Sequence, residues 1–207
     1  MTNKIVETLI NKQSQNEIIT NEDEQIYRYG YILLCEVVLN LVIALIIGIV
    51  FLKTKEIMFF LCVYIPLRSF CGGWHANKIW KCTIISNAIL LLQVYCIENI
   101  VNLISSERML IICFFNMICV FFLAPIETEK KKISHEERLI YRKKIKVMLV
   151  LHLITILATI LWDNKQLEFS IMFAYITQSV MLLLEIAKIS LSKRVIFRKN
   201  QEYSFEE

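Results

Sequence analysis

The side chains best suited to covalent chemistry lie in one short segment, residues 68–82. It reads Arg68-Ser-Phe-Cys-Gly-Gly-Trp-His-Ala-Asn-Lys-Ile-Trp-Lys-Cys82 and holds two of the four glycines and two of the three tryptophans. A histidine near a cysteine can remove the thiol proton and later protonate a leaving group, which makes the sulfur a nucleophile. The pair here would be His75 and Cys82, and the neighbouring cations Arg68, Lys78 and Lys81 would favour the thiolate.

The spacing of this pair limits where His75 can lie. On a straight α-helix, residues seven apart share a face but are separated by about 10.5 Å along the axis. That is too far for a direct hydrogen bond to Cys82. His75 must therefore lie on a turn that folds back over the start of the next helix, or the pair must be completed across a dimer. Gly72 and Gly73 would permit such a turn, because glycine readily adopts positive φ.

Metal binding is a competing interpretation of the same segment. Cys71, His75 and Cys82 could supply three ligands, but no fourth ligand is evident nearby in the sequence. The run His135-Glu136-Glu137 lacks the second histidine of a zinc-protease helix. We therefore expect no metal and no other cofactor.

The rest of the chain must position these residues within a membrane. It has 207 residues, of which 57% are hydrophobic, with a mean hydropathy of +0.55. Long uncharged runs approach the roughly 20 apolar residues that a membrane-spanning helix needs. We expect an all-α, polytopic integral membrane protein. The sequence predicts about six membrane helices, the second of which is short, at residues 30–52, 56–70, 83–104, 108–126, 145–162 and 168–190.

The whole chain, 1–207, is expected to form a single membrane domain. Residues 1–29 are polar, do not read as a signal peptide and form an N-terminal helical region; residues 30–190 form the membrane helices, and 191–207 form a tail. An amphipathic helix is expected near residues 3–12, and a second helix should start near residue 20 and run into the first span. Most of the seven cysteines lie in apolar runs, which argues against a disulfide framework.

Lysine and arginine are distributed unevenly over the links between these segments. With the N-terminus inside, the inner segments hold 19 basic residues and the outer links hold four. Because basic loops tend to stay in the cytoplasm, we expect both termini and the loop 127–144 to be cytoplasmic. The basic loop could anchor the protein to anionic lipid or dock an acidic partner. The net charge of +4 requires no nucleic acid.

The segment 68–82 resembles the signature of the accessory gene regulator B (AgrB) family, membrane cysteine endopeptidases of Gram-positive quorum sensing. The matching residues are Arg68, Gly72, Gly73, His75 and Cys82. The Tyr-Gly pair before the first span, the six-segment layout, the basic inner loop and the length also resemble the family. The resemblance covers nearly the whole chain.

This resemblance implies a thiol protease of the bacterial cell membrane. Family members cut the acidic C-terminal tail from a small AgrD-like propeptide. The enzyme cysteine holds the acyl group as a thioester, and a Cys or Ser of the peptide then closes a thiolactone or lactone ring, the autoinducing signal. By match, Cys82 is the nucleophile and His75 the general base, while Arg68, Gly72 and Gly73 support the site. A homodimer is also implied.

Further polar residues carry hypotheses of their own. Glu36 lies about five residues inside the same face of the membrane and could orient His75, although helix pairing is an alternative. The basic run Lys130, Lys131 and Lys132 could bind the acidic tail. Other polar residues in the spans, including Asn40, Gln93, Asn116 and Gln178, are expected to bond between helices, and His152 is expected to be a packing residue.

The rival function is a membrane transporter or exporter of a small peptide without hydrolytic chemistry. It would depend on intramembrane polar residues such as Glu36, Asn40 and Glu185. The two halves of the chain show no repeat of the kind found in many transporters, which weakens this interpretation.

Overall fold

The computed structural model describes residues 6–8, 10, 24–74, 79–127 and 133–204. The longer described elements are all helical: α2 (Glu24–Val50), α3 (Thr54–Cys71), α4 (Ile79–Asn99), the short 3-10 helix η1 (Val101–Leu103), α5 (Ser106–Leu123), α6 (His135–Leu161) and α7 (Lys165–Ser204). The predicted all-α class is confirmed. All seven cysteines are free.

Five of these helices are long and apolar enough to cross a membrane: α2, α4, α5, α6 and α7. The sixth, α3, has only 18 residues, and these include Lys55, Glu56 and Arg68. It also carries Pro66, yet it continues past this residue to Cys71. The second predicted segment is thus a helix, and its charges set it apart from the five apolar spans.

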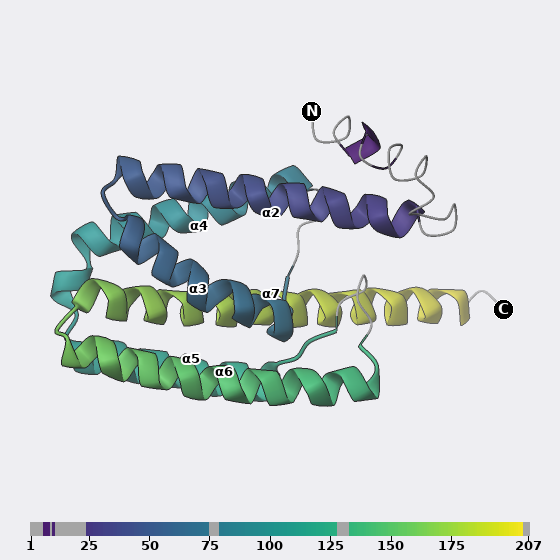
Figure 1. Cartoon of the computed structure of the whole chain (residues 1–207). Coiled ribbons are helices and arrows are strands. Elements are labelled where there is room, and N and C mark those ends of the chain that lie inside the picture. The colour runs from purple at the N-terminus through teal and green to yellow at the C-terminus, as the bar shows by residue number, and fades with distance from the viewer. Residues whose placement is uncertain (1–5, 9, 11–23, 75–78, 128–132, 205–207) are drawn as a thin grey trace.

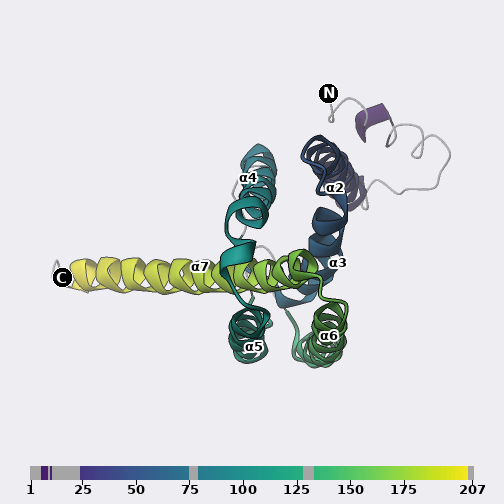
Figure 2. The same ribbon diagram turned by 90° about the vertical axis from the view of Figure 1, so that its left-hand side faces the viewer.

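Helix α7 forms the centre of the bundle. It passes between the α2–α4 pair and the α5–α6 pair, and α3 lies beside it (Figures 1 and 2). The outer helices carry many exposed apolar side chains, as lipid-facing helices do, whereas the described part of α7 is mostly buried. Its buried polar side chains include Ser170, Thr177, Gln178 and Ser179, so polar groups are concentrated where protein, and not lipid, surrounds them.

Several polar side chains link the helices as expected. The Gln93 amide on α4 donates to the Glu56 carbonyl oxygen and the Ser170 hydroxyl, each at 3.2 Å. The His152 ring on α6 lies 2.8 Å from the Tyr175 hydroxyl on α7, which fits the packing role expected of it. Asn116 differs, because its amide donates to the carbonyl of Ile112 in its own helix.

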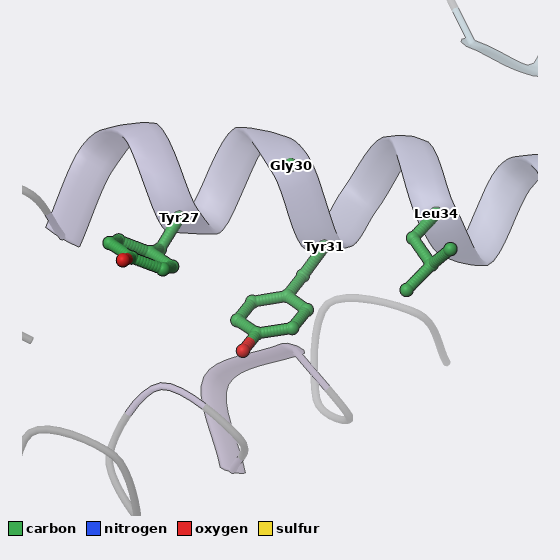
Figure 3. A pocket seen from close by; sticks show the side chains of 4 residues that line it. All are labelled: Tyr27, Gly30, Tyr31 and Leu34. Carbon is green, nitrogen blue, oxygen red and sulfur yellow. The ribbon is translucent and has the colours of Figure 1, made fainter. Parts of the chain in front are cut away.

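The short N-terminal turn rests against α2. Val6 and Ile10 are buried, whereas Glu7 is exposed, as an amphipathic helix requires. The Glu7 carboxylate lies 3.7 Å from the Arg28 guanidinium on α2. Beside it, Tyr27, Gly30, Tyr31 and Leu34 line a cavity of about 290 Å³, and Tyr31 projects from α2 toward the turn (Figure 3).

Two helices extend well beyond the predicted membrane segments. α6 begins at His135, ten residues before the predicted 145, because the side chains of Ser134 and Glu137 form a capping box at its start. α7 continues to Ser204, past the predicted 190, because no glycine or proline interrupts it. Helix α2 starts at Glu24 and runs into the first span, as predicted.

The ends of the helices alternate between the two sides of the bundle. The start of α2, the end of α3, the start of α4, the end of α5, the start of α6 and the end of α7 all lie toward one side (Figure 1). On the other side, the Lys53 ammonium donates to the Gln166 side chain at 3.2 Å and joins the α2–α3 connection to the first turn of α7.

We predict that the side carrying the end of α3 is cytoplasmic, because it holds most of the basic residues. Single cysteines would replace Ser134 and Asp163 in a chain without the native cysteines. An impermeant thiol reagent added to intact cells should label Asp163→Cys. It should label Ser134→Cys only after permeabilisation, and labelling of Ser134→Cys from outside would overturn the predicted orientation.

Candidate functional site

The site is built on the turn that follows α3. Gly72 and Gly73 have φ angles of +73° and +124°, a region that side chains other than glycine rarely adopt. Space is also lacking: a Cβ atom on Gly72 would lie 2.7 Å from the Ile126 carbonyl oxygen, and one on Gly73 would overlap the Arg68 guanidinium. Both glycines are therefore required for the chain to turn so close to its neighbours.

Arg68, in the last turn of α3, holds this turn in place. Its guanidinium donates to the carbonyl oxygens of Gly72 at 2.7 Å and Gly73 at 3.2 Å, and also to that of Trp74. These carbonyls follow the end of a helix and have no helical donors. The arginine thus acts through its planar set of N–H groups, and a lysine could not reproduce that arrangement.

Other helices hold the same turn from outside. The Gln178 amide on α7 donates to the Gly72 carbonyl at 2.9 Å, and the Trp74 backbone N–H donates to the Met181 carbonyl at 2.9 Å. The backbone N–H of Ile126, after α5, donates to the Cys71 carbonyl at 3.0 Å. The turn is therefore tied to the central helix and to the end of α5.

Cys82 lies in the first turn of α4 and lines a cavity of about 240 Å³ within the bundle. Arg68, Trp74 and Tyr64 line the same cavity. The Cys82 thiol is partly buried and hydrogen-bonds with the Ser86 side chain one turn along α4. The cavity thus brings a thiol together with a cationic side chain at one end of the membrane helices.

Glu36, on α2, lies near this thiol. Its carboxylate is close enough to Cys82 to interact with it electrostatically, as is the Arg68 guanidinium. One carboxylate oxygen, Oε1, is buried and has no hydrogen-bond partner among the described residues. An acidic group on α2 therefore has an acceptor available beside the cavity.

Not every predicted site residue can be placed. His75 and the run Lys130, Lys131 and Lys132 lie outside the described residues. Cys71 is fully buried at the end of α3 and is not part of the cavity lining. Within the described ranges, no three His, Cys, Asp or Glu side chains form a group suited to a metal ion. This does not test the set Cys71, His75 and Cys82, since His75 is not among those residues.

The sequence did not identify several residues that complete the site. Gln178 was expected only to bond between helices; it does so, and its partner is the turn itself. The roles of the Met181 carbonyl and of Ser86 depend on packing that no local pattern encodes. Asn40 and Asn87 line the cavity. Asn40 was expected to bond between helices, and Asn87, five residues after Cys82 on α4, was not singled out.

These features define a class: a polytopic α-helical membrane protein with a thiol in an internal cavity and a glycine turn held by arginine. The accessory gene regulator B family matches residues 2–182, so this chain belongs to the AgrB family. Membership implies a part in processing the quorum-sensing signal of accessory gene regulator systems, and family members work with an AgrD-like propeptide.

Two AgrB-like proteins of Clostridium perfringens are similar to the chain. The one from strain 13 / Type A is 27% identical over 176 residues, which cover 80% of each chain. The one from strain SM101 / Type A is 28% identical over 168 residues, which cover 75% of this chain and 77% of the relative. No solved structure matches this chain.

We predict that Gly73→Ala destabilises the protein and that Gly30→Ala does not. A side chain at φ +124° costs about 1–3 kcal/mol, which should lower Tm by several degrees. Gly30 lies within α2, where an added Cβ meets nothing within 4 Å and alanine favours the helix. Thermal unfolding in detergent, followed by circular dichroism, measures the Tm of both variants and of the unaltered protein. Equal Tm values for the two variants would contradict the role assigned to the turn.

Proposed function

We propose that this chain is a membrane cysteine endopeptidase that also closes a peptide ring. It cleaves the acidic C-terminal tail from a small AgrD-like propeptide and releases a thiolactone or lactone signal. The observation that carries the proposal is the position of Cys82, which shares a cavity with Arg68 and Trp74. In sequence, His75 directly follows Trp74, which supports its assignment as the base that acts on Cys82.

The proposed reaction has two acyl transfers. His75 takes the proton of the Cys82 thiol, and the thiolate attacks the carbonyl carbon at the cut site. The C–N bond breaks, and His75 gives the proton to the departing amine of the acidic tail. A thiol or hydroxyl within the bound peptide then attacks the thioester and loses its proton to His75. The ring forms, and His75 gives this proton to the sulfur of Cys82, which regenerates the thiol.

Arg68 is proposed to position the site. Its guanidinium is engaged by three backbone carbonyls, so its main effect is to fix Trp74 and thereby the start of the segment that carries His75. Its positive charge near Cys82 also favours the thiolate, whereas the Glu36 carboxylate opposes it. The apolar surroundings would keep water from the thioester and leave ring closure as its main outcome.

Glu36 is proposed to orient His75. The support is its position close to Cys82 and its buried oxygen, which has no hydrogen-bond partner among the described residues and could accept a hydrogen bond from the imidazole N–H. A carboxylate hydrogen-bonded to histidine fixes the tautomer and the ring direction. Glu36→Asp should then retain more activity than Glu36→Gln, and equal activity of the two variants would count against the role.

The acidic tail is proposed to bind the basic region of the loop 128–132 and α6. The described part supports this: α6 exposes Arg142 and Lys143, and the Lys144 ammonium lies 4.7 Å from the ring centroid of Phe70, two residues before the glycine turn. The run Lys130, Lys131 and Lys132 would extend this basic surface. We also propose cytoplasmic termini in the bacterial cell membrane and a homodimer.

We predict that Cys82→Ala and His75→Ala each abolish propeptide cleavage while the protein still inserts in the membrane. Cys71→Ala should retain most activity, because the Cys71 side chain is buried outside the cavity. The assay follows cleavage, in membranes, of the cognate AgrD-like propeptide. A peptide transporter would tolerate Cys82→Ala, and a metal enzyme would need Cys71 and stop on addition of a chelator.

The same assay tests the basic surface. Replacing Lys130, Lys131 and Lys132 by glutamine should raise KM more than it lowers kcat, since tail binding contributes equally to the ground state and the transition state. Membrane insertion is checked for this variant, because these lysines also set orientation. A large loss of kcat at unchanged KM would contradict tail binding.

A further inference from the structure

The cavity at Cys82 continues far into the bundle. Along α4 its lining runs from Cys82 to Leu90, eight helical steps that span about 12 Å. Arg68 and Trp74 lie with the thiol near the turn, whereas Phe60 and Leu90 are further along their helices. Most of the lining is apolar: Val37, Leu41, Phe60, Leu61, Ile65, Ile85, Ile89, Leu90 and Met181.

The size of the cavity limits what it can hold. Its volume is about 240 Å³, whereas an apolar cavity of about 150 Å³ accepts benzene. Pockets for drug-sized ligands begin at about 300 Å³. The cavity therefore fits one large side chain with its adjoining backbone, and it is too small for an amphipathic leader helix.

Charge decides which part of the substrate enters. In the described lining, Arg68 is the only charged side chain, and both of its terminal nitrogens already donate to backbone carbonyls of the turn. An acidic tail placed among the apolar residues would lose its hydration without gaining a partner. The tail must therefore leave toward the basic end of α6, and the acyl side of the cut site faces the cavity.

Two amides in the lining add a polar component. Asn40 and Asn87 both line the cavity, and the side-chain oxygen of each is buried without a hydrogen-bond partner among the described residues. The Asn87 amide nitrogen already donates to the Thr83 carbonyl at 2.8 Å, which leaves its oxygen as a free acceptor. A backbone N–H of a bound peptide would satisfy such an acceptor, whereas a lipid chain has no donor.

We propose that this cavity is the acyl-side specificity pocket and that it selects a bulky apolar residue immediately before the cleaved bond. The proposal rests on the proposed function, because it takes Cys82 as the nucleophile. The side chain of that residue would fill the space between α2, α3 and α4. Its carbonyl carbon would then lie at the Cys82 end of the cavity.

The first test varies the substrate. The probe is the cognate AgrD-like propeptide, with the residue before the cut changed to Phe, Leu, Ala or Asp. Phe and Leu should be cleaved with a kcat/KM at least about tenfold above that of Ala, and Asp should be cleaved least. Equal rates for all four peptides, still dependent on Cys82, would overturn the pocket but leave the proposed function intact. Loss of the dependence on Cys82 would overturn the proposed function itself.

The second test varies the pocket. Leu41→Ala enlarges the cavity and should shift the preference from Leu toward Trp at this position. Leu45→Ala, one turn along α2 and outside the lining, should keep the original preference. The ratio of kcat/KM between two peptides is measured within one variant, so differences in folding or insertion cancel. The same ratio in Leu41→Ala, Leu45→Ala and the unaltered protein would contradict the assignment.

Discussion

The hydrogen bonds that Arg68 donates to the turn after α3 hold the candidate site together. The turn after α3 leaves three backbone carbonyls without helical donors, and a buried carbonyl left unpaired costs about 1–3 kcal/mol. Arg68 donates to the carbonyls of Gly72, Gly73 and Trp74, and these bonds in turn compensate its partly buried charge. An irregular segment can therefore exist between two membrane helices. The glycines are as necessary as the arginine, because a Cβ on either one would collide with its surroundings.

The central helix determines where that turn lies. Because α7 is surrounded by protein, it can carry polar groups, and Gln178 and the Met181 carbonyl bind the turn directly. The α5 end binds it through Ile126. A helix with a lipid-facing surface could not offer these contacts without exposing polar groups to hydrocarbon. The buried position of α7 thus connects the fold of the bundle to the geometry beside Cys82.

The sequence predicted the helices well, because long apolar runs have few alternatives in a membrane. Helix ends were harder to predict: the capping box of Ser134 and Glu137 lies outside the apolar run, and α7 continues as a polar helix after its apolar part ends. The sequence did identify the residues around the turn, because they lie together in one local motif, residues 68–82. Those that complete the cavity, such as Asn40, Asn87 and Met181, come from three helices, and only packing brings them together. Why these partners and not others contact the turn cannot be read from spacing along the chain.

The central claim is that Cys82 carries the peptide as a thioester and that ring closure normally resolves it. A thioester is higher in energy than the amide it replaces, so it persists only if water is excluded and the second nucleophile is close. The direct measurement uses a propeptide whose ring-forming residue is changed to Ala, followed by mass spectrometry of the enzyme. The account predicts an enzyme adduct of raised mass, released by neutral hydroxylamine and absent in Cys82→Ala. Rapid conversion to the linear acid with no adduct at any time would mean ordinary hydrolysis and would contradict it.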